Sequence, residues 1–136
     1  MQEERLRSVA VIVGGAIGSL ARWTVGNWIE SSPGAFPTAT FVVNVSGAFG
    51  LGVAGVLLIE IMAPTRYLRT LITIGFFGAY TTFSTMALEG VRLLDIGHES
   101  VALSYWIASF LVGQSAAIAG MWLGRSIGRS RREVAG

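Results

Sequence analysis

The chain has 136 residues, of which 52% are hydrophobic and 13% charged, and its mean hydropathy is +0.62. This is too apolar for an ordinary soluble domain, so the sequence predicts an integral membrane protein. The lack of cysteine excludes disulfides, thiolate metal sites and a cysteine nucleophile, and the single His98 excludes a histidine triad. The net charge of +2 does not indicate a nucleic-acid partner, because the arginines gather at helix ends rather than along one folded face.

Four hydrophobic segments are long enough to span a bilayer, which takes about 20 apolar residues. In chain order they occupy residues 9–28, 37–61, 68–96 and 100–123. Because three more segments follow the first, and acidic and basic side chains mix in front of it, we interpret it as a retained helix rather than a cleaved signal. Residues 124–136 are expected to form a basic cytoplasmic tail. The sequence therefore predicts an all-α, single four-helix membrane domain.

Small residues recur at every fourth position in three of these segments, which places them on one helical face where backbones approach closely. The series are Gly14 and Gly18; Ser46, Gly50 and Ala54; and Gly120, Gly124 and Gly128. Packing within one chain accounts for any one of these faces. Four short helices enclose little interior, however, so we expect some of the faces to contact a second copy or a partner.

The third segment is interrupted by a polar run at residues 75–85, which brings together two glycines, several aromatics and four serine and threonine hydroxyls. Glycine costs a helix about 1 kcal/mol relative to alanine, and hydroxyls can replace lost backbone bonds. One interpretation is a discontinuous helix whose free carbonyls bind a cation, or whose hydroxyls serve a permeating ion. The other is a continuous helix whose hydroxyls bond to preceding carbonyls.

Polar residues elsewhere in the spans have similar double interpretations. Asn44 lies inside the second segment and should face protein or water, either in a pore or as an interhelical bond. Arg22 near the end of the first segment suits a charged vestibule, or its stem reaches the interface. Glu89 is three residues before Arg92, a spacing that predicts an ion pair near the membrane surface.

These groups indicate transport rather than catalysis. The spans contain no paired carboxylates at depth, no nucleophile with a base and no metal-ligand cluster in the sequence, so we expect no enzyme activity. Hydroxyl and amide donors, with aromatic edges of partial positive charge, suit a small anion that must be dehydrated but not held too tightly. For a cation pore we would expect rings of aspartate or glutamate instead.

The chain resembles the fluoride channels of the CrcB or Fluc family over essentially its whole length. The matching elements are Gly14-Gly15-Ala16-Ile17-Gly18 with Arg22, then Thr40 followed by Val43-Asn44-Val45 and Gly47, and the run from Gly75-Phe76 to Thr85, with Glu89 after it. Each element alone is weak. Thr-Thr-Phe-Ser-Thr after the Gly-Phe approach, in a four-helix protein of this size, is a specific combination.

The resemblance implies antiparallel dimers of four-helix subunits, with two fluoride pores at the subunit interface. It also implies a structural sodium ion at the dimer centre, held by main-chain carbonyls at the positions of Gly75 and Gly78. The pore-lining asparagine corresponds to Asn44, and the aromatic pair that faces the ions corresponds to Tyr80 and Phe83. The remaining positions that the resemblance places in or near the polar pathway are Thr81, Thr82, Ser84 and, in the fourth segment, Ser109.

Two positions depart from the family pattern. Tyr80 stands where the family usually has phenylalanine, so its hydroxyl needs a partner and either donates to fluoride or narrows the path. Ala39 stands where glycine often precedes the threonine, a change that we expect only to tighten local packing. From the first departure we expect the Tyr80→Phe variant to retain fluoride transport.

The arginines are distributed unevenly between the two ends of the spans. The end with both termini and the second loop has eight, and the other has Arg22 and Arg92. This imbalance predicts cytoplasmic termini in the cell membrane, surrounded by lipid. Since a subunit inserting in both orientations should have balanced loops, we hypothesise a heterodimer with a related subunit as the alternative to a homodimer.

Two other functions compete with fluoride export. In the first, the chain is not a channel subunit but a non-conducting partner in a heterodimer. Such a partner is expected to show no fluoride flux by itself. A small multidrug-type exporter, also an antiparallel four-helix dimer, is expected to have a membrane-embedded glutamate in its first helix. The predicted first segment, residues 9–28, has none.

Overall fold

A computed structural model describes residues 1–30, 32–61 and 65–134. It contains four long helical runs, and each is long enough and apolar enough to span a membrane. They are α1 (Gln2–Trp28); α2 (Thr38–Gly55), continued by the π-helical segment η1 (Val56–Ile61); a third run made of α3 (Arg66–Arg69), the π-helical segment η2 (Thr70–Phe77), α4 (Gly78–Tyr80) and α5 (Phe83–Asp95); and α6 (Glu99–Val134). The described residues form no strand, and the all-α membrane fold is confirmed.

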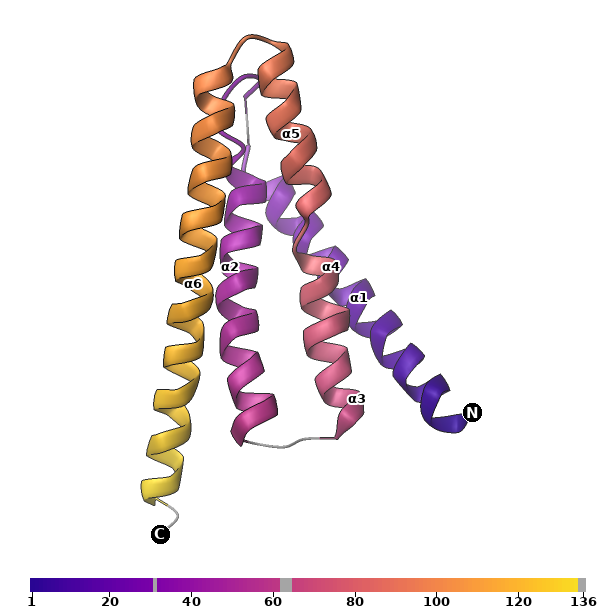
Figure 1. Ribbon diagram of the computed structural model, residues 1–136. Coiled ribbons are helices and arrows are strands. Elements are labelled where there is room, and N and C mark those ends of the chain that lie inside the picture. Colours follow the sequence, from indigo (N-terminus) through magenta and orange to yellow (C-terminus); the bar gives the residue numbers. More distant parts are fainter. Residues whose placement is uncertain (31, 62–64, 135–136) are drawn as a thin grey trace.

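The helices pack as two pairs: α2 with α6, and α1 with the first half of the third run. α2 lies along α6, and α1 crosses behind η2 and α4 (Figure 1). The amino end of α1, the start of α3 and the carboxyl end of α6 lie at one end of the molecule, and the α5–α6 turn lies at the other (Figure 1). This topology places the midpoint of the third run at the centre of the fold.

Glycines set both of these helix contacts. A side chain at Gly14 or Gly18 would collide with backbone carbonyls of η2, and one at Gly120 would collide with the carbonyl of Phe49 on α2. Because only glycine allows this approach, these two series are used for packing within the chain. In the remaining series, Gly50 leaves room for the ring of Phe77 rather than for another backbone.

Several predicted boundaries differ from those of the structure. The first helix begins at Gln2 rather than near Val9, because Glu3 and Glu4 in its first turn suit a helix amino end. The fourth helix continues to Val134, so the boundary expected near residue 123 is corrected. Arginine is a good helix former, and beyond the bilayer the helix backbone needs no apolar side chains. The basic residues after 123 are thus mostly a helical extension.

Candidate functional site

The break in the third run lies at Thr81 and Thr82, between α4 and α5. Both residues are extended, with φ −78° and ψ 157° at Thr81 and φ −149° and ψ 117° at Thr82. A π-helical segment directly precedes α4, and such segments often occur at functional sites. The polar run therefore forms a discontinuous helix, which is the first of the two interpretations from the sequence.

Side chains from the two preceding helices satisfy the backbone of the break. Asn44 of α2 accepts from the Thr82 amide at 2.8 Å and donates to the Thr82 carbonyl at 3.0 Å. Arg22 of α1 donates to the Thr81 carbonyl, with 3.4 Å between its Nη1 and the oxygen. Unpaired backbone groups are very costly at membrane depth, so these contacts make the break sustainable. Asn44 and Arg22 thus have a structural role in addition to any contact with an ion.

Hydroxyls of the run complete the local bonding. Thr81 donates to the Phe77 carbonyl at 2.9 Å, and the Thr82 oxygen accepts from the Thr85 amide at 3.2 Å, which makes Thr82 the amino-terminal cap of α5. The Thr82 hydroxyl also lies 3.0 Å from the Thr85 hydroxyl and 3.3 Å from that of Ser84. Thr82 is buried, whereas Ser84 is exposed. Of the threonine and serine hydroxyls here, that of Ser84 is the most open.

Tyr80 and Phe83, the two aromatic residues that were expected to face the ions, lie in different surroundings. Tyr80 stacks on Phe76, with ring centroids 5.6 Å apart, and its hydroxyl is 2.9 Å from Ser46 of α2. Phe83 is 77% exposed and has no ring contact among the described residues. One ring is therefore held against its own subunit, and the other projects from the chain.

A second polar cluster lies on the α5–α6 side of the break, around Glu89. Its carboxylate accepts from Thr40 at 2.9 Å and from Tyr105 at 2.8 Å. The predicted ion pair with Arg92 is wrong. Among the described residues the ion pair that forms joins Arg125 to Glu60, and Glu89 and Arg92 form none. Helical spacing brought Glu89 and Arg92 to adjacent positions, but two hydroxyls on packed helices give the carboxylate a more buried environment.

Tyr105, which is fully buried in α6, was not among the residues predicted from the sequence. One signal in the sequence could have identified Tyr105. It lies four residues before Ser109, a predicted site residue, and this spacing puts both on one helical face. The Ser109 hydroxyl is also buried, and it has no hydrogen-bond partner among the described residues. A buried hydroxyl without a partner is unusual and indicates that water, an ion or another chain supplies one.

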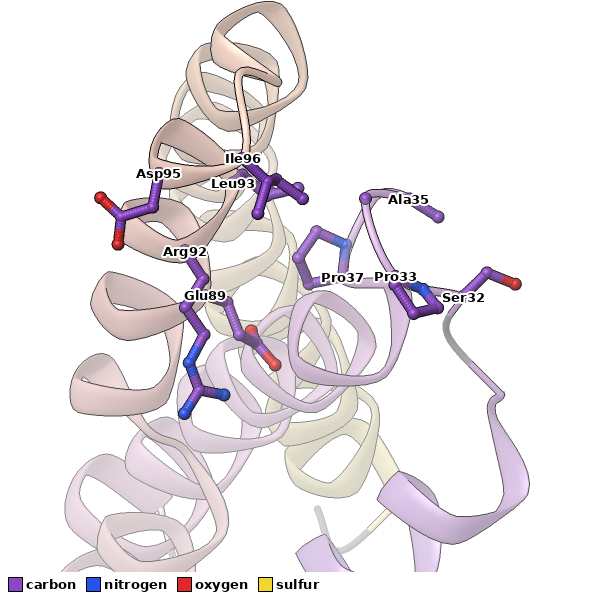
Figure 2. A pocket seen from close by; sticks show the side chains of 10 residues that line it. Ser32, Pro33, Ala35, Pro37, Glu89, Arg92, Leu93, Asp95 and Ile96 are labelled. Carbon is purple, nitrogen blue, oxygen red and sulfur yellow. The ribbon is translucent and has the colours of Figure 1, made fainter.

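A pocket of about 570 Å³ opens above this cluster, between the loop at residues 32–37 and the last turns of α5. Glu89 and Arg92 line its wall, and the Asp95 carboxylate points away from Pro37 (Figure 2). His98 holds the loop by donating from Nδ1 to the Gly34 carbonyl at 3.0 Å. The pocket therefore connects solvent at this end of the molecule with the carboxylate that Thr40 and Tyr105 bind.

The break has opposite polarity on its two sides. The amino end of α5 and the Arg22 guanidinium bring positive potential to it, which favours an anion. On the other side, the Thr82 amide bonds to Asn44 instead of to the Gly78 carbonyl four residues back, where a continuous helix would place it. Gly78 faces open space, whereas Gly75 is buried against Gly14 of α1. A carbonyl released in this way suits a hard cation.

Comparison with known proteins identifies related sequences. The family model described as CrcB-like protein, Camphor Resistance (CrcB), matches residues 9–121. The chain is 41% identical over 121 residues to fluoride-specific ion channel FluC 2 of Nocardia farcinica, covering 89% of this chain and 84% of the relative. It is 42% identical over 119 residues to FluC of Acidobacterium capsulatum, covering 87% and 92%.

A further relative differs in length. The chain is 43% identical over 116 residues to FluC 3 of Streptomyces avermitilis, which covers 85% of this chain but only 57% of that protein. All three relatives have names that describe ion channels, so the expectation that the chain is not an enzyme is confirmed.

Proposed function

We propose that this chain, which belongs to the CrcB family, conducts fluoride ions across the cell membrane and so lowers fluoride in the cytoplasm. The observation that carries the proposal is the break in the third membrane span, with its backbone satisfied by Asn44 and Arg22 and the exposed Phe83 at its outer side. The related proteins named as fluoride-specific channels support the same function.

The chemistry around the break favours a small anion. Arg22 and the amino end of α5 supply positive potential, and the edge of the Phe83 ring supplies weakly positive hydrogens without a fixed charge. Such groups stabilise a dehydrated anion but still release it. The Ser109 hydroxyl and the cluster of Glu89 with Tyr105 continue the polar groups toward the pocket at the outer end.

A structural sodium ion is a second part of the proposal. The carbonyls of Gly75 and Gly78 would hold it. The Gly78 carbonyl fits because it lies at the negative, carbonyl end of the broken helix, whereas the Gly75 carbonyl accepts from the Gly78 amide and would bind sodium through its second lone pair. The bond from the Thr82 amide to Asn44 removes the ordinary helical donor of the Gly78 carbonyl. When bound, sodium supplies a positive charge that links backbone carbonyls and stabilises an assembly around the break.

The proposed assembly is an antiparallel dimer embedded in lipid. Phe83 is exposed, and Gly78 faces open space at the centre of the span, which supports a protein neighbour at this position. A second copy would bring another break and another set of carbonyls to the same centre. Fluoride pathways would then form between Phe83 of one subunit and the polar groups of the other.

The charge bias of the chain bears on the identity of the second subunit. Eight of the ten arginines belong to the end of the spans that contains both termini, which favours cytoplasmic termini. A strongly biased chain inserts in one orientation, so an oppositely biased relative would complete an antiparallel pair. We therefore keep a homodimer and a heterodimer as alternatives, and in the heterodimer this chain is either conducting or a non-conducting partner.

Fluoride efflux from liposomes tests these alternatives directly. The purified chain, and separately the chain co-expressed with an oppositely biased relative, would be reconstituted into vesicles loaded with potassium fluoride. Efflux with valinomycin from the first sample supports a homodimeric channel, and efflux only from the second supports a heterodimer. Absence of fluoride efflux from both correctly folded samples would contradict the proposed function.

A further inference from the structure

The hydroxyl of Tyr80 has a defined position in this chain. It lies 2.9 Å from the Ser46 hydroxyl, and its ring stacks on Phe76 with an interplanar angle of 12°. On α2, a side chain at Gly47 would collide with the Thr81 methyl group and meet the Tyr80 ring at 3.1 Å, so the glycine makes room for both. Three contacts therefore fix the ring and the direction of its hydroxyl.

The protons of these two hydroxyls can be assigned by counting them. A serine hydroxyl has one proton, and Ser46 donates to the Val43 carbonyl at 3.2 Å. The carbonyl has no proton to return. If the Ser46 proton is not shared between two acceptors, both bonds of Ser46 form together when Tyr80 is the donor and the Ser46 oxygen is the acceptor, and this is the assignment that we adopt. Tyr80 therefore uses its single proton within its own subunit.

This assignment has a consequence for an anion at the break. With its proton bonded to Ser46, the Tyr80 oxygen presents lone pairs, which repel an anion, while the ring edge keeps its weakly positive hydrogens. A free tyrosine hydroxyl would instead donate a charge-assisted hydrogen bond to fluoride. We infer that Ser46 is a specificity-determining residue that holds the Tyr80 proton away from the permeating ion, an inference that rests on the proposed fluoride conduction.

Removal of the Ser46 hydroxyl should change fluoride binding and release together. In Ser46→Ala the Tyr80 proton loses its acceptor and becomes available to fluoride. The half-saturating fluoride concentration and the maximal flux should both fall by about tenfold, the size expected for one hydrogen bond to an ion. A general packing defect would lower the maximal flux without tightening fluoride binding.

A double-mutant cycle tests whether Ser46 acts through Tyr80. Tyr80→Phe sets the reference for the second arm of the cycle, and Ser46→Ala in the Tyr80→Phe background should cause no further change in fluoride binding or flux. Ser104→Ala is the matched control, because Ser104 donates to the carbonyl three residues back, Val101, at 2.9 Å but has no tyrosine partner. An equal effect of Ser46→Ala in both backgrounds, or no effect in either, would overturn the inference.

A spectroscopic measurement separates this inference from conduction itself. The tyrosine doublet in ultraviolet resonance Raman spectra distinguishes a donating hydroxyl from an accepting one. The spectrum of Ser46→Ala should differ from that of the parent chain by the loss of one donating tyrosine. When the same substitution is made in the Tyr80→Phe variant, the spectrum should not change. A Ser46→Ala spectrum identical to the parent spectrum would refute the proton assignment even if the chain conducts fluoride, and a positive spectrum with no conduction would refute only the proposed function.

Discussion

Backbone groups within a membrane span must be hydrogen-bonded inside the protein. The contact between α2 and α6 and the break between α4 and α5 meet this requirement in opposite ways. At the α2–α6 contact the backbone bonds stay inside each helix, and Gly120 allows close packing against the Phe49 carbonyl. At the break the helical bonds are given up, and Asn44 and Arg22 replace them from other helices. Packed glycines thus make a scaffold, whereas side chains that bond to backbone sustain a polar, non-helical segment within a candidate membrane span. Substitutions in the two regions should therefore affect different properties.

Removal of the Asn44 amide should have the largest effect. Asn44→Ala leaves the Thr82 amide and carbonyl without partners, at about 1–3 kcal/mol for each group, and we expect fluoride flux to fall by about two orders of magnitude. Flux per folded protein in proteoliposomes is the measurement. Asn27→Ala, an exposed asparagine near the end of α1, should leave flux unchanged and is the control. Normal flux in Asn44→Ala would show that the break does not depend on this bond.

Phe83 should separate function from stability. Its ring is 77% exposed in the chain, so Phe83→Ala should leave the unfolding temperature of the subunit nearly unchanged. Fluoride flux should fall by at least about tenfold, because the variant removes the ring edge from the proposed pathway. Trp122→Ala removes another aromatic side chain, 73% exposed near the far end of α6, and should affect neither property. Full activity in Phe83→Ala would remove this ring from the proposed pathway.

Two glycines of α6 should respond differently to the same change. Gly120→Ala places a methyl group against the Phe49 carbonyl and should destabilise the fold by about 1–3 kcal/mol. Gly113→Ala meets no atom within 4 Å and should be neutral, or stabilising by up to about 1 kcal/mol through helix propensity. Thermal unfolding in detergent measures both. Equal destabilisation in the two variants would mean that close backbone approach does not set the α2–α6 contact.

The cap of α5 should give the smallest effect. Thr82→Ala removes the oxygen that accepts from the Thr85 amide and should cost about 1 kcal/mol, whereas Thr82→Ser keeps that oxygen and should retain most of the stability. Hydrogen exchange at the Thr85 amide reports the cap directly. Faster exchange in Thr82→Ala but not in Thr82→Ser is the expected result, and equal exchange rates in all three proteins would exclude the capping role.

The sequence was sufficient for the spans and for the location of the break, because both depend on local composition. Twenty apolar residues specify a span, and glycines with consecutive threonines specify a weak point in the third one. The sequence also indicated that Asn44 needs a polar partner. It did not indicate that this partner is the backbone of Thr82, because that pairing depends on how α2 lies against the third run.

The partners of Glu89 were beyond local reasoning for the same reason. A spacing of three residues favoured Arg92, yet the carboxylate bonds to Thr40, which is 49 residues away in the chain, and to Tyr105. Burial decided the outcome, since hydroxyls satisfy a carboxylate inside the helix bundle without bringing in a second charge. The predicted end of the fourth helix, residue 123, was too early. Hydropathy shows where the apolar side chains end, whereas the helix itself continues to Val134.

The most direct test of the central claim compares fluoride and chloride efflux from liposomes that contain the folded protein, with its oppositely biased relative where one is required. We predict rapid efflux of fluoride, little efflux of chloride, and loss of most fluoride efflux in Asn44→Ala while Asn27→Ala remains active. Equal efflux of the two anions, or fluoride efflux that is unchanged in Asn44→Ala, would contradict a fluoride pathway organised by the broken third span.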